Sequence, residues 1–166
     1  EQLEQWNKDG RGIFFSVNRF PTGERKQVLC KGVNAWFMES DTLSIEEQWQ
    51  RIVACPLEPS FIVRSKKSYH VYWLAKDGTI KNFNTIGNGL LKYFDGDPAV
   101  VDIARVLRIP GFNHMKDPDN PFPVEVFDAH VENVYTEEQI LQAFPYEKPP
   151  TKEYKPKERK SNDFWD

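Results

Sequence analysis

The stretch Asn34-Ala-Trp-Phe-Met-Glu39-Ser-Asp41 joins an apolar run to two carboxylates that are separated by one residue. Successive side chains of a β-strand point to opposite faces, so a strand over residues 32–41 would place Ala35, Phe37, Glu39 and Asp41 on one face. Neighbouring carboxylates repel each other, and a bound divalent cation relieves that repulsion. The stretch predicts a buried strand that ends in a metal site; a solvated turn before the next helix is the alternative.

The segment that follows has its own helix start signal. Ser44 stands three residues before Glu47, which is the spacing of a capping box for a helix from Ile45 to about Ala54. Glu39 and Asp41 are therefore not required as helix caps.

Composition limits the class of protein. The 166 residues suffice for one domain with a core or for two small units, and the hydrophobic share of 39% suits a folded globule. The longest apolar runs are far shorter than the ~20 residues of a membrane span. No secretory signal opens the chain, because residues 1–11 are polar and charged. We expect a soluble, cytoplasmic protein with no membrane association.

The cysteines and the net charge exclude two further classes. Cys30 and Cys55 are the only cysteines and form no CxxC pair, which argues against a structural zinc site. The net charge of −3 argues against bulk attraction to nucleic acid. Contacts with nucleic acid must therefore come from local basic patches.

The remaining pattern mixes strands and helices. Strands are predicted over 12–18, 61–64, 70–74 and 123–127, and helices over 84–94 and from Thr136, as the cap, to about Phe144. The chain from residue 147 is rich in proline and lysine. We expect a core over residues 1–146 and a linker or tail over 147–166.

A second group of polar residues lies between two of these strands. The loop Ser65-Lys66-Lys67-Ser68-Tyr69-His70 offers lysine charge and hydroxyl donors, which together suit phosphate oxygens. The alternative is a solvated hairpin whose lysines keep a sheet edge soluble.

A third group begins at Asp102, which precedes Arg105 and Arg108. If Asp102 met Glu39 and Asp41, three carboxylates could hold two divalent ions ~3.5 to 4 Å apart, the arrangement that aligns phosphoryl transfer. The alternative is a surface pair between Asp102 and Arg105. A weaker group, Asn113, His114 and Lys116, could reach a template or primer strand, or could belong to a plain loop.

These groups, in this order, resemble the motifs of the archaeo-eukaryotic primase superfamily, and especially of its plasmid and phage RepB-like primase-polymerase branch. Phe37-Met-Glu39-Ser-Asp41 is similar to the first motif, Ser68-Tyr69-His70 to the second and Val101-Asp102 to the third. The run from Arg105 to Lys116 resembles the Arg-Leu-Pro-Gly, Asn and Lys run of this branch. Glu39 stands where many members have aspartate, which changes reach rather than charge.

The resemblance implies an α+β fold in which a modified RRM-like sheet packs against a second small α/β unit, with the active site between them. It implies primer synthesis and extension from NTP or dNTP substrates on a single-stranded DNA template. Glu39, Asp41 and Asp102 would bind two Mg²⁺ or Mn²⁺ ions. Nucleotide phosphates would contact Ser68, His70, Lys66, Lys67, Arg105 and Arg108.

Two other functions stay open at this point. A different metal-dependent phosphodiester enzyme, such as a nuclease or a replication initiator, would also use carboxylates. A non-catalytic RRM-like nucleic-acid-binding module would have no use for three converging acids. A helicase or another replication domain after the tail is the expected protein partner.

Overall fold

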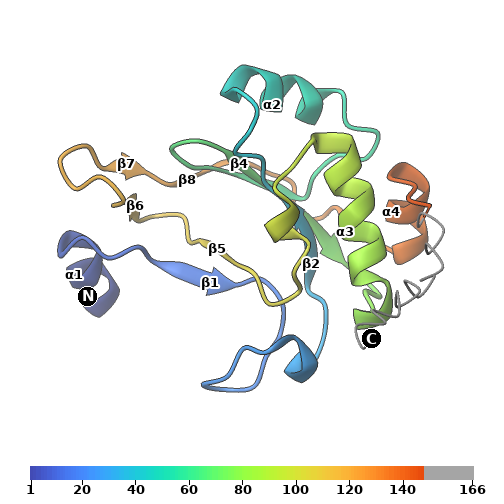
Figure 1. Ribbon diagram of the computed structural model, residues 1–166, viewed down its shortest axis with the longest axis horizontal. Helices are drawn as coiled ribbons and strands as arrows, with labels where there is room; N and C mark the ends of the chain where they lie inside the picture. Colours follow the sequence, from blue (N-terminus) through green and yellow to red (C-terminus); the bar gives the residue numbers. More distant parts are fainter. Residues whose placement is uncertain (148–166) are drawn as a thin grey trace, which may run out of the picture.

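The computed structural model describes residues 1–147 and contains a helix-backed sheet beside a set of short β-ribbons (Figure 1). The helices are α1 (Gln2–Lys8), α2 (Ile45–Val53), α3 (Ile80–Phe94) and α4 (Glu137–Ala143), with 3-10 turns at Gln27–Leu29 and Pro98–Val100. The strands are β1 (Phe14–Ser16), β2 (Ala35–Met38), β3 (Phe61–Arg64), β4 (Tyr69–Ala75), β5 (Val106–Arg108), β6 (Asn113–His114), β7 (Phe122–Pro123), β8 (Glu125–Ala129) and β9 (Val134–Tyr135). The expected tail lies, apart from residue 147, outside the described residues.

The main sheet has the strand order β2-β4-β3-β8, and all three of these pairings are antiparallel. The short strand β9 pairs with the end of β4 in parallel. All four residues of β2 are buried, so neither face of this strand meets solvent. The sheet therefore needs a covering layer on each side.

Alternate residues of β2 and β4 face these two layers. Trp73 packs its ring against Phe94 of α3 and Phe144 after α4, at centroid distances of 5.7 and 5.4 Å. Its chain neighbour Tyr72 faces the other way and lies 6.3 Å from Phe15 of β1. Because side chains alternate along a strand, His70 and Tyr72 project from the face that carries β1. In Figure 1, α3 and α4 lie together on the right of the sheet, and β1 and β5 lie on its left.

The helices begin where short polar side chains cap them. Ser44 and Glu47 form the predicted capping box of α2, and Thr136 forms a second one with Gln139 at α4. Helix α3 begins at Ile80 rather than at residue 84, because the Thr79 hydroxyl accepts from the Asn82 amide and caps the helix there. Gly87 and Gly89 therefore lie inside the helix rather than in its first turn. Helix α1 has no side-chain cap, and the sequence signals did not predict it.

The second unit consists mainly of two antiparallel ribbons. Strand β1 pairs with β5, and β6 pairs with β7. The predicted α+β fold, with a sheet facing a second small unit, is confirmed. The helical parts of that second unit are α1 and the turn at Gln27–Leu29. Among residues 1–147, no helix is long and apolar enough to cross a membrane.

Candidate active site

The two acids of the opening stretch follow β2 directly. The strand ends at Met38 rather than at residue 41, because the Glu39 carbonyl accepts from the Asp97 amide (3.1 Å) and the Ser40 hydroxyl donates to the Asp95 carbonyl (3.0 Å). These contacts turn the backbone away from β4 and toward the loop after α3. A Cβ atom at residue 96 would stand 2.9 Å from the Glu39 carbonyl oxygen, so Gly96 permits this close approach.

Glu39 is buried, and each of its carboxylate oxygens has a nitrogen partner. His70 Nε2 lies 3.1 Å from Oε2, and Arg105 Nη2 lies 3.0 Å from Oε1. Burial opposes ionisation of Glu39, but the hydrogen bonds and charges of His70 and Arg105 together outweigh it, so the pKa of Glu39 lies below its ordinary value. Glu39 is therefore an ionised carboxylate held at the junction of both units.

Helix α2 holds the loop between β3 and β4 in place through hydrogen bonds. The side chain of Gln48, which is buried, donates to the carbonyls of Leu43 (2.8 Å) and Lys67 (3.1 Å) and accepts from the Tyr69 amide (2.9 Å). The Ser65 amide donates to the Ser68 carbonyl (2.8 Å), which closes the turn. The loop thus presents Ser68 and His70 in one fixed conformation.

The opposite wall comes from the ribbons. The Arg108 guanidinium of β5 lies 4.7 Å from the ring centroid of Phe14, its cross-strand partner in β1. Burial lowers the pKa of Arg108, and the charge of Glu39 acts in the opposite direction. Burial lowers the pKa of His114 as well, as do the charges of Arg108, Lys66, Lys116 and His70 in that order. Within residues 1–147, neither ring nitrogen of His114 has a hydrogen-bond partner.

The N-terminal helix holds the ribbon that carries His114. The side chain of Asn7, which is buried on α1, donates to the carbonyls of Arg11 and Asn113 (both 2.9 Å) and accepts from the Asn113 amide (2.8 Å). This pairing uses the backbone of Asn113 in the way that a neighbouring strand would. Asn7 therefore fixes the start of β6 against the N-terminus.

These groups line one cleft of about 220 Å³ between the sheet and the ribbons. From the sheet side come Glu39, Asp41, Ser65, Lys67, Ser68 and His70. From the ribbon side come Phe14, Arg105, Val106, Leu107, Arg108, His114 and Lys116. The structure thus brings together most of the residues that the sequence singled out, from segments far apart in the chain.

Three predicted residues do not line this cleft. Asp102 is exposed in a turn, where its carboxylate accepts from the Ala104 amide (2.9 Å). Lys66 turns toward the β6–β7 hairpin and donates to the Asn120 carbonyl (3.0 Å), so it lies outside the cleft lining. The side chain of Asn113 is exposed, and only its backbone is held by Asn7.

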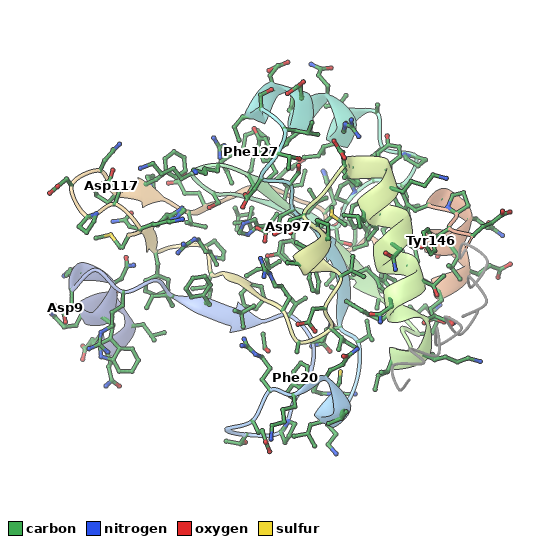
Figure 2. All side chains as sticks on the ribbon, in the orientation of Figure 1. Asp9, Phe20, Asp97, Asp117, Phe127 and Tyr146 are labelled. Carbon is green, nitrogen blue, oxygen red and sulfur yellow. The ribbon has the colours of Figure 1, made fainter. Side chains whose placement is uncertain are left out.

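Asp97, rather than Asp102, shares the Arg105 guanidinium with Glu39. Asp97 Oδ2 lies 3.7 Å from the same Arg105 nitrogen that contacts Glu39. Figure 2 shows Asp97 in the middle of the molecule, between α3 and β5. No local pattern favours Asp97 as a metal ligand, because a proline follows it and it suits the cap of a short turn. It has that role here, since its carboxylate accepts from the Ala99 amide.

Sequence reasoning also missed Phe14, Gln48 and Asn7. Phe14 belongs to the continuous apolar run Ile13-Phe14-Phe15, in which periodicity does not distinguish core residues from exposed ones. Gln48 and Asn7 are ordinary polar residues of helices, and only their distant partners give them a role. No local signal would have identified them.

The carboxylates suit a divalent cation that is bound together with phosphate. No group of three or more histidine, cysteine, aspartate or glutamate side chains gathers as a metal site in the described part of the chain. Glu39 and Asp41 nevertheless line the same cleft. Mg²⁺ commonly takes one or two carboxylates and completes its shell with water and substrate phosphates, so this donor set fits such an ion.

Comparisons with known proteins identify the family and agree with the fold. The model of the RepB DNA-primase N-terminal domain family matches residues 23–155. The AEP domain of the cyanophage S-2L primase-polymerase is 25% identical with a TM-score of 0.74, and the match covers 87% of this chain and 76% of that chain. No curated protein sequence matches.

Two structures of the primase RepB′ show a similar fold. One is 21% identical with a TM-score of 0.59, and the match covers 86% of this chain but 46% of that chain. The other, the catalytic domain in complex with initiator DNA, is 22% identical with a TM-score of 0.58, covering 86% of this chain and 69% of that chain. The present chain thus spans about half the length of the longer RepB′ chain.

The fold and the cleft define an archaeo-eukaryotic primase-type catalytic domain of the primase-polymerase kind. More narrowly, the chain belongs to the family of RepB DNA-primase N-terminal domains. Its function is therefore of the primase type, the synthesis of nucleic acid by a nucleotidyltransferase-type enzyme, in a superfamily that generally depends on divalent metal.

Proposed function

We propose that this chain synthesises primers de novo and extends them on single-stranded DNA by nucleotidyl transfer with two divalent cations, Mg²⁺ or Mn²⁺. One observation carries the proposal: in a member of a primase family, two carboxylates share a cleft with cations and hydroxyls of the kind that suit phosphate. A nuclease would also accept such acids, but no observation in the described residues favours it.

Glu39 and Asp41 would hold the cations at the floor of the cleft. Cations held by these two carboxylates would supply a lowered pKa of the attacking hydroxyl and a counter-charge for the triphosphate. Glu39 is already ionised in the folded protein, because His70 and Arg105 hold its pKa low. No proton has to leave Glu39 before a cation binds.

The phosphate contacts would come from both walls. Ser68 and Lys67 offer a hydroxyl and an ammonium group from the fixed loop. His70 and Arg105 now use Glu39 as their acceptor, and both line the cleft, so a triphosphate would offer them oxygen atoms in place of Glu39. Arg108 and Lys116 would add charge from the ribbon side.

Asp102 would supply the third carboxylate of a two-ion centre. Support for this role comes from the order of the motifs, with Asp102 three residues before the cleft residue Arg105. Its side chain would first have to leave the Ala104 amide.

The nucleic-acid partner that we propose is a single-stranded DNA template, in line with the RepB′ catalytic domain that was crystallised with initiator DNA. Because the net charge is −3, attraction of the DNA phosphates must come from local cations such as Lys116, and binding should weaken steeply with salt. A helicase or another replication domain is the protein partner that we propose.

Replacing Asp41 tests the proposed activity. We expect the wild-type chain to incorporate labelled nucleotide on single-stranded DNA with Mg²⁺ or Mn²⁺, and Asp41→Ala to abolish incorporation, because a cation ligand is lost. Asp41 is exposed, so its replacement should leave the melting temperature unchanged. Asp9→Ala is the matched control, since Asp9 is an exposed aspartate on the N-terminal side of the molecule (Figure 2).

The experiment has two outcomes against the proposal. A wild-type chain that incorporates no nucleotide with either metal contradicts the polymerase function. Full activity of Asp41→Ala contradicts the assignment of the acids.

A further inference from the structure

Phe14 is an exposed aromatic ring in a cleft that is otherwise mostly polar. It is 48% exposed although it belongs to the apolar run that covers the sheet, and its neighbours Ile13 and Phe15 are buried or half-buried. Core packing therefore does not explain the ring. Phe14 lines the same cleft as Ser68 and His70, so its ring can contact the molecule that the cleft binds.

The ring is held in place from one side. The Arg108 guanidinium lies 4.7 Å from its centroid, and the two residues face each other across the β1–β5 ribbon. A Cβ atom at residue 12 would stand 2.7 Å from Cε2 of Phe14 and 2.9 Å from Nη1 of Arg108, so Gly12 leaves the room that this stack needs. The guanidinium occupies one side of the ring while about half of the side chain stays open to solvent.

We infer that Phe14 is the platform on which the base of the incoming nucleotide stacks, with Arg108 holding the ring in place. The inference rests on the proposed function, and it names the base subsite of the same cleft. Every nucleobase has a π face, so such a platform binds purines and pyrimidines alike without reading the sequence.

The charges in the cleft favour a nucleotide over a template strand as the occupant. The lining has four cationic side chains, Lys67, Arg105, Arg108 and Lys116, and two carboxylates, Glu39 and Asp41, so 4 − 2 gives a formal charge of +2 with the histidines neutral. A volume of about 220 Å³ confines this charge to one place rather than along a track. A triphosphate matches concentrated positive charge, and its base would then reach the ring at the wall.

Binding experiments on the full chain can separate base from phosphate recognition. We would measure the affinity for dATP and for inorganic tripolyphosphate in the presence of Mg²⁺, together with KM and kcat for incorporation. Phe14→Leu keeps apolar bulk beside Arg108 but removes the π face. Phe14→Trp keeps an aromatic face and should restore binding to within about twofold of wild type.

The expected result is selective. Phe14→Leu should weaken dATP binding at least about fivefold, the lower end of the effect of losing a base–aromatic stack, and leave tripolyphosphate binding unchanged. It should raise KM more than it lowers kcat. Phe127→Ala is the matched control, because Phe127 is 49% exposed but packs on Trp49 below α2, away from the cleft lining (Figure 2).

Three results would overturn the inference: unchanged dATP binding in Phe14→Leu, an equal loss for tripolyphosphate, or a loss confined to single-stranded DNA. Failure of the proposed function gives a different pattern, in which the wild type incorporates no nucleotide. The difference between dATP and tripolyphosphate binding tests the base platform even then.

Discussion

At the scale of single residues, Glu39 shows how the cleft is organised. Its two oxygens contact a histidine of β4 and an arginine that stands 66 residues away in the sequence. The carboxylate is desolvated, and contacts with the Arg105 guanidinium and the His70 imidazole compensate that cost, whereas removal of either partner would leave a buried charge poorly compensated. A residue that resembles a simple metal ligand in the sequence is thus also an ion-pair centre that joins the sheet to the ribbons.

Asp102→Asn tests the third acid at the same scale. Asparagine retains the oxygen that accepts from the Ala104 amide, so the turn should persist, but the negative charge is lost. If Asp102 binds a cation during the reaction, incorporation should fall at least about a hundredfold, above the loss typical of outer-shell partners.

Asp97→Asn serves as the comparison, because it preserves the acceptor for the Ala99 amide in the same way. Near wild-type activity of Asp102→Asn with a large loss in Asp97→Asn would show that the sequence resemblance assigned the wrong aspartate.

At the scale of elements, α2 acts as a support for the β3–β4 loop. Its capping box fixes where the helix begins, and one turn later Gln48 reaches three backbone groups, of which one lies in the loop and one at the first residue of β4. The loop consists of serines and lysines, which have little apolar surface to bury, so it depends on these hydrogen bonds for its shape. The loop that we propose to bind phosphate is therefore shaped by a helix that lies outside the cleft lining.

Gln48→Leu is expected to disorder this loop. Leucine has a similar size but leaves the Leu43 and Lys67 carbonyls and the Tyr69 amide without partners, at about 1–3 kcal/mol for each group that stays buried. We expect a lower free energy of unfolding in urea and an increase of about tenfold or more in the KM for nucleotide.

Gln50→Leu is the matched control on the same helix, because within residues 1–147 the Gln50 amide bonds only to the exposed Glu46 side chain. Equal effects of the two substitutions would mean that Gln48 has no special relation to the loop.

At the scale of the whole molecule, one wall of the cleft is held by a contact between α1 and the distant strand β6. Asn7 pairs with Asn113 across 106 residues, and the β6–β7 hairpin that follows brings Lys66 of the sheet unit into contact with Asn120 and Asp117. Figure 1 shows α1 beside β6 at the end of the molecule farthest from α4, and Figure 2 places Asp117 at the tip of the hairpin. The wall with His114 and Lys116 thus depends on α1.

Asn7→Ala should loosen that wall without affecting the sheet. Three hydrogen bonds to backbone groups are lost, so the Asn113 amide should exchange with solvent faster, and nucleotide incorporation should fall about tenfold. Hydrogen exchange measured at individual amides checks the first effect, and amides of β4 serve as the internal reference.

Asn88→Ala is the matched control, because Asn88 is a helical asparagine whose amide bonds only within α3. Unchanged exchange at Asn113 in the Asn7 variant would contradict the role of α1.

The sequence by itself determined the local structure and the chemical content of the site. The strand just before Glu39, the caps at Ser44 and Thr136 and the serine-lysine loop follow from short-range rules, because alternation and capping involve residues that are near in sequence. Tertiary structure alone decided that Lys66 and Asp102 face away, that Arg105 pairs with Glu39, and that Phe14, Gln48 and Asn7 take part. These outcomes depend on competition between partners far apart in the chain, which no local pattern can encode.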